Sequence, residues 1–92
     1  MKVQSLSQIL VEESLTISVA ESCTGGRLSA LLTSVSGSSA YFDRGYITYS
    51  NQAKIDMLNV DVKVLAQFGA VSEQTAAEMV SSVVQGSHSD VA

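Results

Sequence analysis

The distribution of hydrophobic residues along the chain predicts two short β-strands. Residues 16–20 (TISVA) are β-branched and apolar, and residues 46–49 (YITY) form a second β-branched and aromatic run. Each run is followed by small and polar residues, ESCTGG after the first and SNQ after the second. Such residues are typical of turns that lead from a strand into a helix. We therefore expect two strand–turn–helix units.

Polar residues mark the expected helix starts. Ser5 and Gln8 have capping-box spacing, in which each side chain satisfies an early backbone N–H group. Asn51, Asp61 and Ser72 are predicted N-caps of three further helices. Alternating helices and strands predict an α/β sheet covered by helices. Apolar residues recur at helical spacing at Leu6, Ile9 and Leu10, at Leu28, Leu31, Leu32 and Val35, at Val62, Leu65 and Ala66, and at Ala76, Met79, Val80 and Val83.

The end of the chain has the pattern of an incomplete strand. Residues 87–92 follow Gly86 as a loop that begins another strand-like run. Two strands are few for a sheet covered by several helices, because isolated strand pairs are marginal in water. Either a further strand is hidden, or a partner chain completes the sheet, or the chain is a fragment. We favour the fragment, and expect residues 1–92 to be one domain that is incomplete at its C-terminal end.

Composition and charge narrow the function classes. The 92 residues are 46% hydrophobic and 15% charged, which is typical of one globular domain. A net charge of −4 argues against general nucleic-acid binding, which depends on Lys and Arg neutralising phosphates. No run is long enough to span a bilayer, no signal-peptide pattern opens the chain, and a single cysteine excludes an internal disulfide. We expect a cytoplasmic protein that binds neither nucleic acid nor membrane.

The turn after the first predicted strand, ESCTGG at residues 21–26, is a candidate ligand site. In α/β sheets ligands bind beyond the carboxyl ends of strands, and a helix start offers unpaired N–H groups to an anion such as phosphate. Ser22 and Thr24 supply hydroxyl groups, and Gly25 and Gly26 permit close backbone approach. The alternative is a tight turn without a ligand, because glycine-rich turns of this kind are common without phosphate.

Cys23, within this turn, admits two interpretations. The start of a helix favours a thiolate nucleophile. The only histidine, however, is His88 near the end of the chain, and residue order alone gives no Cys–His pair. We favour a packing role for Cys23 and a solvated loop position for His88. One cysteine and one histidine also leave almost nothing for a structural zinc site, and we expect no metal.

A serine, a tyrosine and a lysine form a second candidate site. With Asn51 as N-cap, Lys54 falls at the third helical position, where the helix dipole repels a cation and favours the neutral amine. A neutral lysine can take a proton from the hydroxyl of Ser39 if the turn at Gly37 folds over the strand end. Tyr49 can relay or orient that proton. The alternative is a solvent-facing lysine, with Tyr49 in the core and Ser39 capping a turn.

Four motifs in register resemble one known family. They are AESCTGG at residues 20–26, GSSAYF at residues 37–42, GYITYSNQAK at residues 45–54 and GAVSE at residues 69–73. Together they resemble the C-terminal domain of the competence/damage-inducible protein CinA and its stand-alone relatives, the nicotinamide-nucleotide amidases. The resemblance implies a three-layer α/β/α sandwich of the CinA C-terminal type. It also implies that this chain is the N-terminal portion of that domain, since the family's domain continues with further strands.

The resemblance also implies a chemistry. Family members hydrolyse the carboxamide of nicotinamide mononucleotide to nicotinate mononucleotide and ammonia, in pyridine-nucleotide recycling. The family's proposed catalytic residues fall here on Ser39 as nucleophile, Lys54 as base and Tyr49 as relay, with no cofactor. A homo-oligomer is expected, and the alternative is a catalytically incompetent module that binds a nucleotide or a partner chain. The expected substrate contacts are Ser22, Thr24, Gly25 and Gly26.

Overall fold

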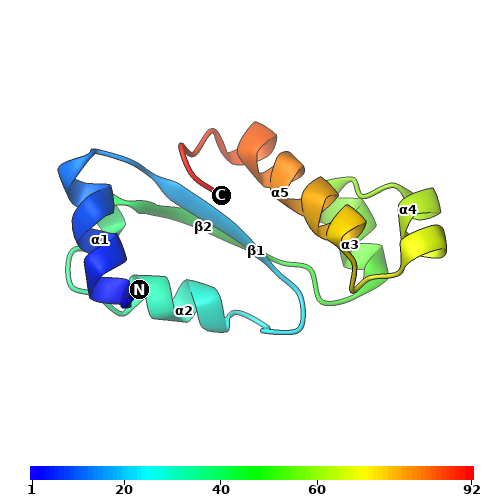
Figure 1. Ribbon diagram of the computed structural model, residues 1–92, viewed down its shortest axis with the longest axis horizontal. Helices are drawn as coiled ribbons and strands as arrows, with labels where there is room; N and C mark the ends of the chain where they lie inside the picture. Colours follow the sequence, from blue (N-terminus) through cyan, green and yellow to red (C-terminus); the bar gives the residue numbers. More distant parts are fainter.

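A parallel pair of strands lies at the centre of the computed structural model, which describes residues 1–92 (Figure 1). β1 (Ile17–Glu21) and β2 (Phe42–Ile47) are joined through helix α2, as parallel strands require a crossover connection. Their pairing ends where Glu21 lies beside Ile47. The carboxyl ends of both strands therefore meet at one edge of the sheet.

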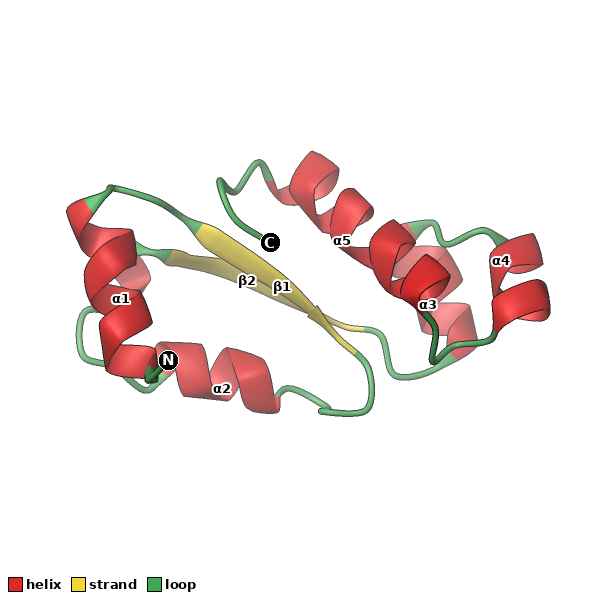
Figure 2. Cartoon of the chain, in the orientation of Figure 1, coloured by secondary structure: helices red, strands yellow, loops and turns green.

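Helices cover both faces of this strand pair (Figure 2). α1 (Val3–Glu12) and α2 (Arg27–Thr33) lie on one side. α5 (Glu73–Ser87) lies on the other side, and α3 (Asn51–Leu58) and α4 (Val62–Phe68) pack against it. This arrangement is the expected three-layer α/β/α sandwich. None of these helices combines enough length with enough hydrophobicity to cross a lipid bilayer.

Each face of the strand pair has its own hydrophobic core, because successive strand residues point to opposite faces. The core beneath α1 and α2 contains the buried aromatic ring of Tyr41, whose hydroxyl donates to the carbonyl oxygen of Leu32 at 2.6 Å. The core beneath α5 includes the side chain of Val83, which is fully buried. The two cores consist of Leu10, Ile17, Val19, Leu32 and Tyr41, and of Leu58, Val60, Leu65, Met79 and Val83.

The observed helix caps match the predicted caps at two positions and differ from them at two others. Asp61 caps α4 and Ser72 caps α5, each through a side-chain oxygen that accepts an early N–H group, as predicted. The predicted capping box at Ser5 is wrong, because α1 already contains this residue in its interior. The prediction that Asn51 caps α3 is also wrong. Ser50 has the extended backbone of a cap and accepts the third N–H group of the helix.

The second strand begins earlier than the hydrophobic pattern predicts. β2 ends before Thr48 and Tyr49, which were expected to belong to it, and it follows a short 3-10 helix, Ser38–Ala40. Pairing with β1 determines these bounds, since the backbone of Gly45 lies beside Val19 in the middle of the ladder. The hydrophobic pattern does not predict this part of the strand, because it contains a glycine and a pair of charged residues.

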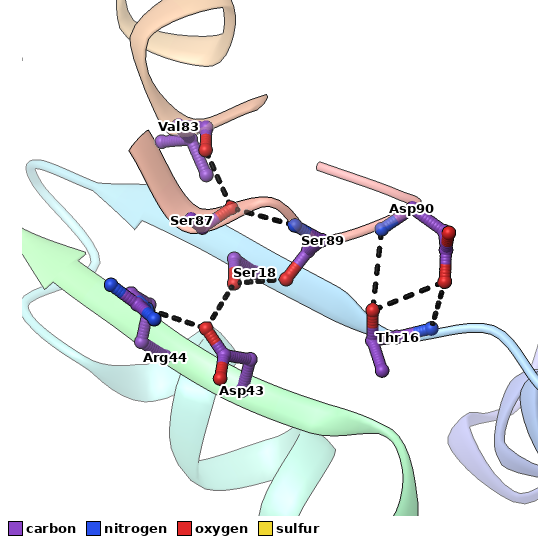
Figure 3. Close-up of polar contacts among 8 residues, drawn as sticks. All are labelled: Thr16, Ser18, Asp43, Arg44, Val83, Ser87, Ser89 and Asp90. Atoms are coloured by element: carbon purple, nitrogen blue, oxygen red, sulfur yellow. Dashed lines mark hydrogen bonds and ion pairs between the residues drawn. The ribbon is translucent and has the colours of Figure 1, made fainter. Parts of the chain in front are cut away.

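The C-terminal segment returns to the free edge of β1. Val91 forms an isolated parallel bridge with Ile17, and its carbonyl oxygen accepts the N–H of Ser18 at 3.0 Å. The hydroxyl oxygens of Ser18 and Ser89 lie 2.7 Å apart in the same region (Figure 3). The expectation that the end of the chain begins another strand is therefore confirmed.

Candidate active site

The carboxyl ends of β1 and β2 bring two turns of the chain together. Residues 22–26 lead from Glu21 into α2, and residues 48–50 lead from β2 into α3. The N–H of Thr48 donates to the carbonyl oxygen of Glu21 at 2.8 Å, so the two segments remain paired one residue beyond the end of β2. Ligands of α/β proteins commonly bind at this end of the strands.

Lys54 lies between these two turns with its side chain only 1% exposed. Because Ser50 is the cap, Lys54 occupies the fourth helical position rather than the predicted third. Its Nζ donates to the Oγ of Ser22 at 3.0 Å and to the carbonyl oxygens of Thr48 and Tyr49 at 2.9 and 3.3 Å. The alternative of a solvent-facing lysine is therefore wrong.

The amine of Lys54 has no carboxylate partner. The only ion pair in the chain lies at the surface and does not involve this residue. A neutral amine here can donate its two N–H bonds to the carbonyls of Thr48 and Tyr49. In that neutral state the direction of the 3.0 Å contact would be reversed, with the hydroxyl of Ser22 donating to the lone pair of the amine. This geometry suits the transfer of a proton from a serine nucleophile to a lysine base.

A buried carboxylate holds the turn next to Ser22. Glu21 is 2% exposed and accepts four hydrogen bonds. The N–H groups of Leu28 and Ser29 donate to it at 2.8 and 2.9 Å, and the hydroxyls of Thr24 and Ser29 at 2.7 and 2.6 Å. Burial raises the pKa of Glu21, but the hydrogen bonds from Ser29 and its neighbours outweigh burial and lower this pKa to about 2. Glu21 is therefore an anion at neutral pH.

The start of α2 is occupied by the protein's own groups. Its early N–H groups already have acceptors, which are the Glu21 carboxylate and the carbonyls of Thr24 and Gly26. The hydroxyl of Thr24 is also engaged, because it donates to Glu21. A phosphate bound at this helix start, as the sequence suggested, would have to displace that carboxylate. The N–H groups of Cys23, Thr24 and Gly26 have no acceptor in the chain and remain open to a ligand.

Ser39 lies at the opposite end of β2 from Lys54. It is exposed in the 3-10 helix that precedes the strand, whereas Lys54 lies in the helix that follows it. The turn at Gly37 leads into the amino end of β2 and does not fold over its carboxyl end. The structure therefore does not bring the predicted Ser39, Tyr49 and Lys54 group together. The hydroxyl next to the lysine belongs to Ser22, which the sequence analysis had assigned to substrate binding.

Tyr49 contributes to the site through its backbone. Its carbonyl oxygen contacts Lys54, while its side chain is 72% exposed and its hydroxyl has no partner in the chain. The alternative of Tyr49 in the core is wrong. A role of the hydroxyl in proton transfer stays a prediction, and the exposed ring is available to a bound substrate.

The remaining candidate residues lie at the surface. Cys23 is exposed, so the packing role expected for it is wrong. His88 is exposed at the C-cap of α5, in agreement with the solvated position predicted for it. No three His, Cys, Asp or Glu side chains gather in a way that could hold a metal ion.

Comparison with known proteins gives a consistent result along the chain. The family model described as the CinA C-terminal domain matches residues 2–92. A CinA-like protein of Chlorobium limicola is 53% identical over 89 residues, which are 97% of this chain and 21% of the relative. The nicotinamide-nucleotide amidohydrolase PncC of Escherichia coli is 43% identical over 89 residues, which are 97% of this chain and 54% of the relative. The chain thus spans about half of the PncC length and about a fifth of the CinA-like length.

Solved structures agree with the sequence comparison. A competence/damage-inducible protein from Agrobacterium tumefaciens has a TM-score of 0.89 and 43% identity, with 96% of this chain and 52% of that chain covered. A CinA superfamily protein from Escherichia coli has a TM-score of 0.92 and 35% identity, with 96% and 51% covered. Since the family model matches almost every residue, this chain belongs to the CinA C-terminal domain family.

Proposed function

We propose that this chain hydrolyses the carboxamide of a nicotinamide nucleotide, with Ser22 as nucleophile and Lys54 as base. The observation that carries the proposal is the 3.0 Å contact between the Lys54 Nζ and the Ser22 Oγ at the carboxyl ends of the strands. The lysine is buried, faces no carboxylate, and its other two contacts are backbone carbonyls. An amine held in this way is suited to activate a neighbouring hydroxyl.

The proposed reaction has two acyl-transfer steps. The Ser22 oxygen attacks the amide carbon while its proton moves to the Lys54 amine, which gives a tetrahedral intermediate. The intermediate collapses as the C–N bond breaks, and the Lys54 ammonium returns the proton to the leaving nitrogen, which departs as ammonia. Water then attacks the Ser22 ester while Lys54 accepts one of its protons, and the ester C–O bond breaks as the Lys54 ammonium returns that proton to the Ser22 oxygen, which frees the carboxylic acid and restores the serine and the neutral amine.

The open N–H groups beside Ser22 are the candidate oxyanion donors. The N–H of Cys23 directly follows the nucleophile, and the N–H of Thr24 is close to it in the same turn, and neither has an acceptor in the chain. Removing one such donor from a hydrolase typically lowers kcat by about 10²–10³-fold. We therefore propose that these N–H groups stabilise the negative charge that develops on the amide oxygen.

The substrate class comes from the relatives. Those that are 43% identical are named nicotinamide-nucleotide amidohydrolases, and this chain covers 54% of their length. A nicotinamide nucleotide carries the amide that a serine–lysine pair can cleave. The substrate that we propose is nicotinamide mononucleotide, and the products are nicotinate mononucleotide and ammonia.

Ammonia release from nicotinamide mononucleotide by the purified chain tests the proposal. The comparison is with Ser22→Ala and Lys54→Met, purified identically so that a contaminating amidase would appear in every sample. Release by the unaltered chain that both variants lose supports the proposal. Equal release by all three proteins, or none by a folded chain, contradicts it. In the latter case, binding of the nucleotide measured by calorimetry would favour the binding module.

A further inference from the structure

The carboxylate of Glu21 is buried next to the proposed nucleophile, but the proposed reaction gives it no task. It lies in β1 directly before Ser22, and its two oxygens accept hydrogen bonds from two different segments. One segment is the turn, through the hydroxyl of Thr24. The other is the start of α2, through Leu28 and Ser29. A buried anion is costly unless it is well hydrogen-bonded, and four donors meet that requirement here.

The backbone of Glu21 reaches the opposite side of the site. Its carbonyl oxygen accepts both the N–H and the hydroxyl of Thr48, at 2.8 and 3.3 Å. The carbonyl of Thr48 in turn accepts a hydrogen bond from the amine of Lys54. Glu21 is thus connected through its side chain to the turn that carries Ser22, and through its backbone to the segment that holds the lysine.

Ser29 supports this carboxylate because β2 leaves room for it. The Oγ of Ser29 lies 2.6 Å from Glu21, and a Cβ atom added at Gly45 would lie only 2.4 Å from the same Oγ. Real Cβ atoms essentially never approach another atom so closely. The missing side chain at Gly45 therefore lets α2 approach the strands closely enough for Ser29 to reach Glu21.

We propose that Glu21 is a positioning residue that fixes the turn at residues 22–26 so that the Ser22 hydroxyl stays within reach of Lys54, with Ser29 and Gly45 as its support. This inference rests on the proposed function for its effect on catalysis. On this proposal the Glu21 carboxylate occupies the N–H groups of Leu28 and Ser29 at the start of α2. The phosphate of a nucleotide must then bind elsewhere.

The first test measures turnover in Glu21→Gln, which keeps the side-chain size but presents an N–H₂ group to N–H donors. We expect kcat to fall by about tenfold to a hundredfold, because small misplacements of a nucleophile have effects of this order, while KM changes by less than about threefold. Asp61→Ala is the matched control, since it removes a helix cap whose side chain bonds neither the turn at residues 22–26 nor the amine of Lys54. Both proteins are compared at temperatures where they are fully folded. A kcat loss in Glu21→Gln no larger than in the control overturns the proposal.

The second test does not depend on turnover. Cys23 is the only cysteine, is exposed and lies within the turn, so its alkylation by iodoacetamide reports on the turn alone. Ser29→Ala and Gly45→Ala leave the charge of Glu21 in place but remove or displace its support. We expect both to change the alkylation rate by about threefold or more, and Asp61→Ala to leave it unchanged, because mobile segments react differently from fixed ones.

The two tests separate the two proposals. If the unaltered chain releases no ammonia, the proposed function fails, while a changed alkylation rate in Ser29→Ala and Gly45→Ala still shows that the Glu21 contacts fix the turn. If alkylation is the same in all four proteins, the positioning role is overturned whatever the activity. The rescue variant Ser29→Thr, which restores a hydroxyl at this position, is expected to react closer to the unaltered rate than Ser29→Ala does.

Discussion

The two ends of the strand pair are built from similar residues but have opposite physical characters. At the carboxyl ends, Glu21, Thr48 and Lys54 are all buried and linked by hydrogen bonds, with Ser22 partly covered among them. At the amino end of β2, Ser39 is exposed in a short 3-10 helix. A buried amine that could activate a serine hydroxyl therefore lies beside Ser22 and not beside Ser39.

The difference follows from the direction of parallel strands. Residues that follow β1 and residues that follow β2 meet at the same edge, whereas the segment before β2 arrives at the other edge. A lysine in α3 can therefore reach a serine that follows β1 but not one that precedes β2. The assignment of Ser39 rested on the family resemblance and on a turn at Gly37 that folds over the strand end, and the observed turn leads into the amino end of β2 instead.

The largest expected effect compares the two serines directly. Ser22→Ala should lower ammonia release by about a thousandfold or more, because loss of a nucleophile removes the covalent route. Ser39→Ala should change it by less than about threefold, since exposed residues away from a site have small effects. Steady-state assays at saturating nicotinamide mononucleotide measure both. A large loss in Ser39→Ala with activity kept in Ser22→Ala would reverse the comparison and restore the original assignment.

Much of the fold could be predicted from the sequence. The caps at Asp61 and Ser72, the first strand and the layered α/β/α arrangement followed from local patterns that tertiary contacts did not override. The start of β2 could not, because Gly45 and the charged pair before it lack a strand pattern. Their place depends on α2 packing closely against the strand.

The site was predicted only in part. Lys54 was identified from the resemblance and from its place near a helix start, but its partner depends on strand direction, which residue spacing does not reveal. Glu21 and Thr48 were given no role. A signal for Glu21 was present, since an acidic residue that ends a strand before a glycine-rich turn can reach the N–H groups of the following helix. Thr48 had no such signal, because it contributes mainly through its backbone.

A second prediction compares two glycines, one packed against the site and one at the amino end. Gly45→Ala should destabilise the fold by about 1–3 kcal/mol, because the new methyl group would collide with Ser29 and force the helix away. Gly37→Ala meets no atom within 4 Å but has a φ of 84°, so its cost should be nearer about 1 kcal/mol. Urea denaturation measures both. Equal costs would show that α2 can move without strain, which contradicts the tight packing over β2.

A third prediction concerns acid, and it follows from the pKa of Glu21. This pKa is about 2 in the folded chain against an ordinary value of 4.5, so the folded state binds the proton less readily than the unfolded state. The stabilisation is therefore fully present above pH 4.5 and is lost as the pH falls towards 2. The melting temperature of the unaltered chain should decline more steeply across this window than that of Glu21→Gln. Parallel curves for the two proteins would mean that Glu21 is not held as an ionised group.

The smallest expected effect tests whether the burial of Lys54 or the start of its helix keeps the amine in place. Ser50→Ala removes the side-chain acceptor for the N–H of Ala53 at 3.0 Å, and loss of such a cap costs about 1 kcal/mol. The amine of Lys54 is held separately by Ser22 and two carbonyls, so kcat should change by less than about threefold even though the melting temperature falls. A kcat loss well above about threefold, measured at a temperature where the variant is fully folded, would show that the helix start positions the lysine. The contrast between the two ends would then depend on the cap of α3 as much as on the buried contacts around Glu21.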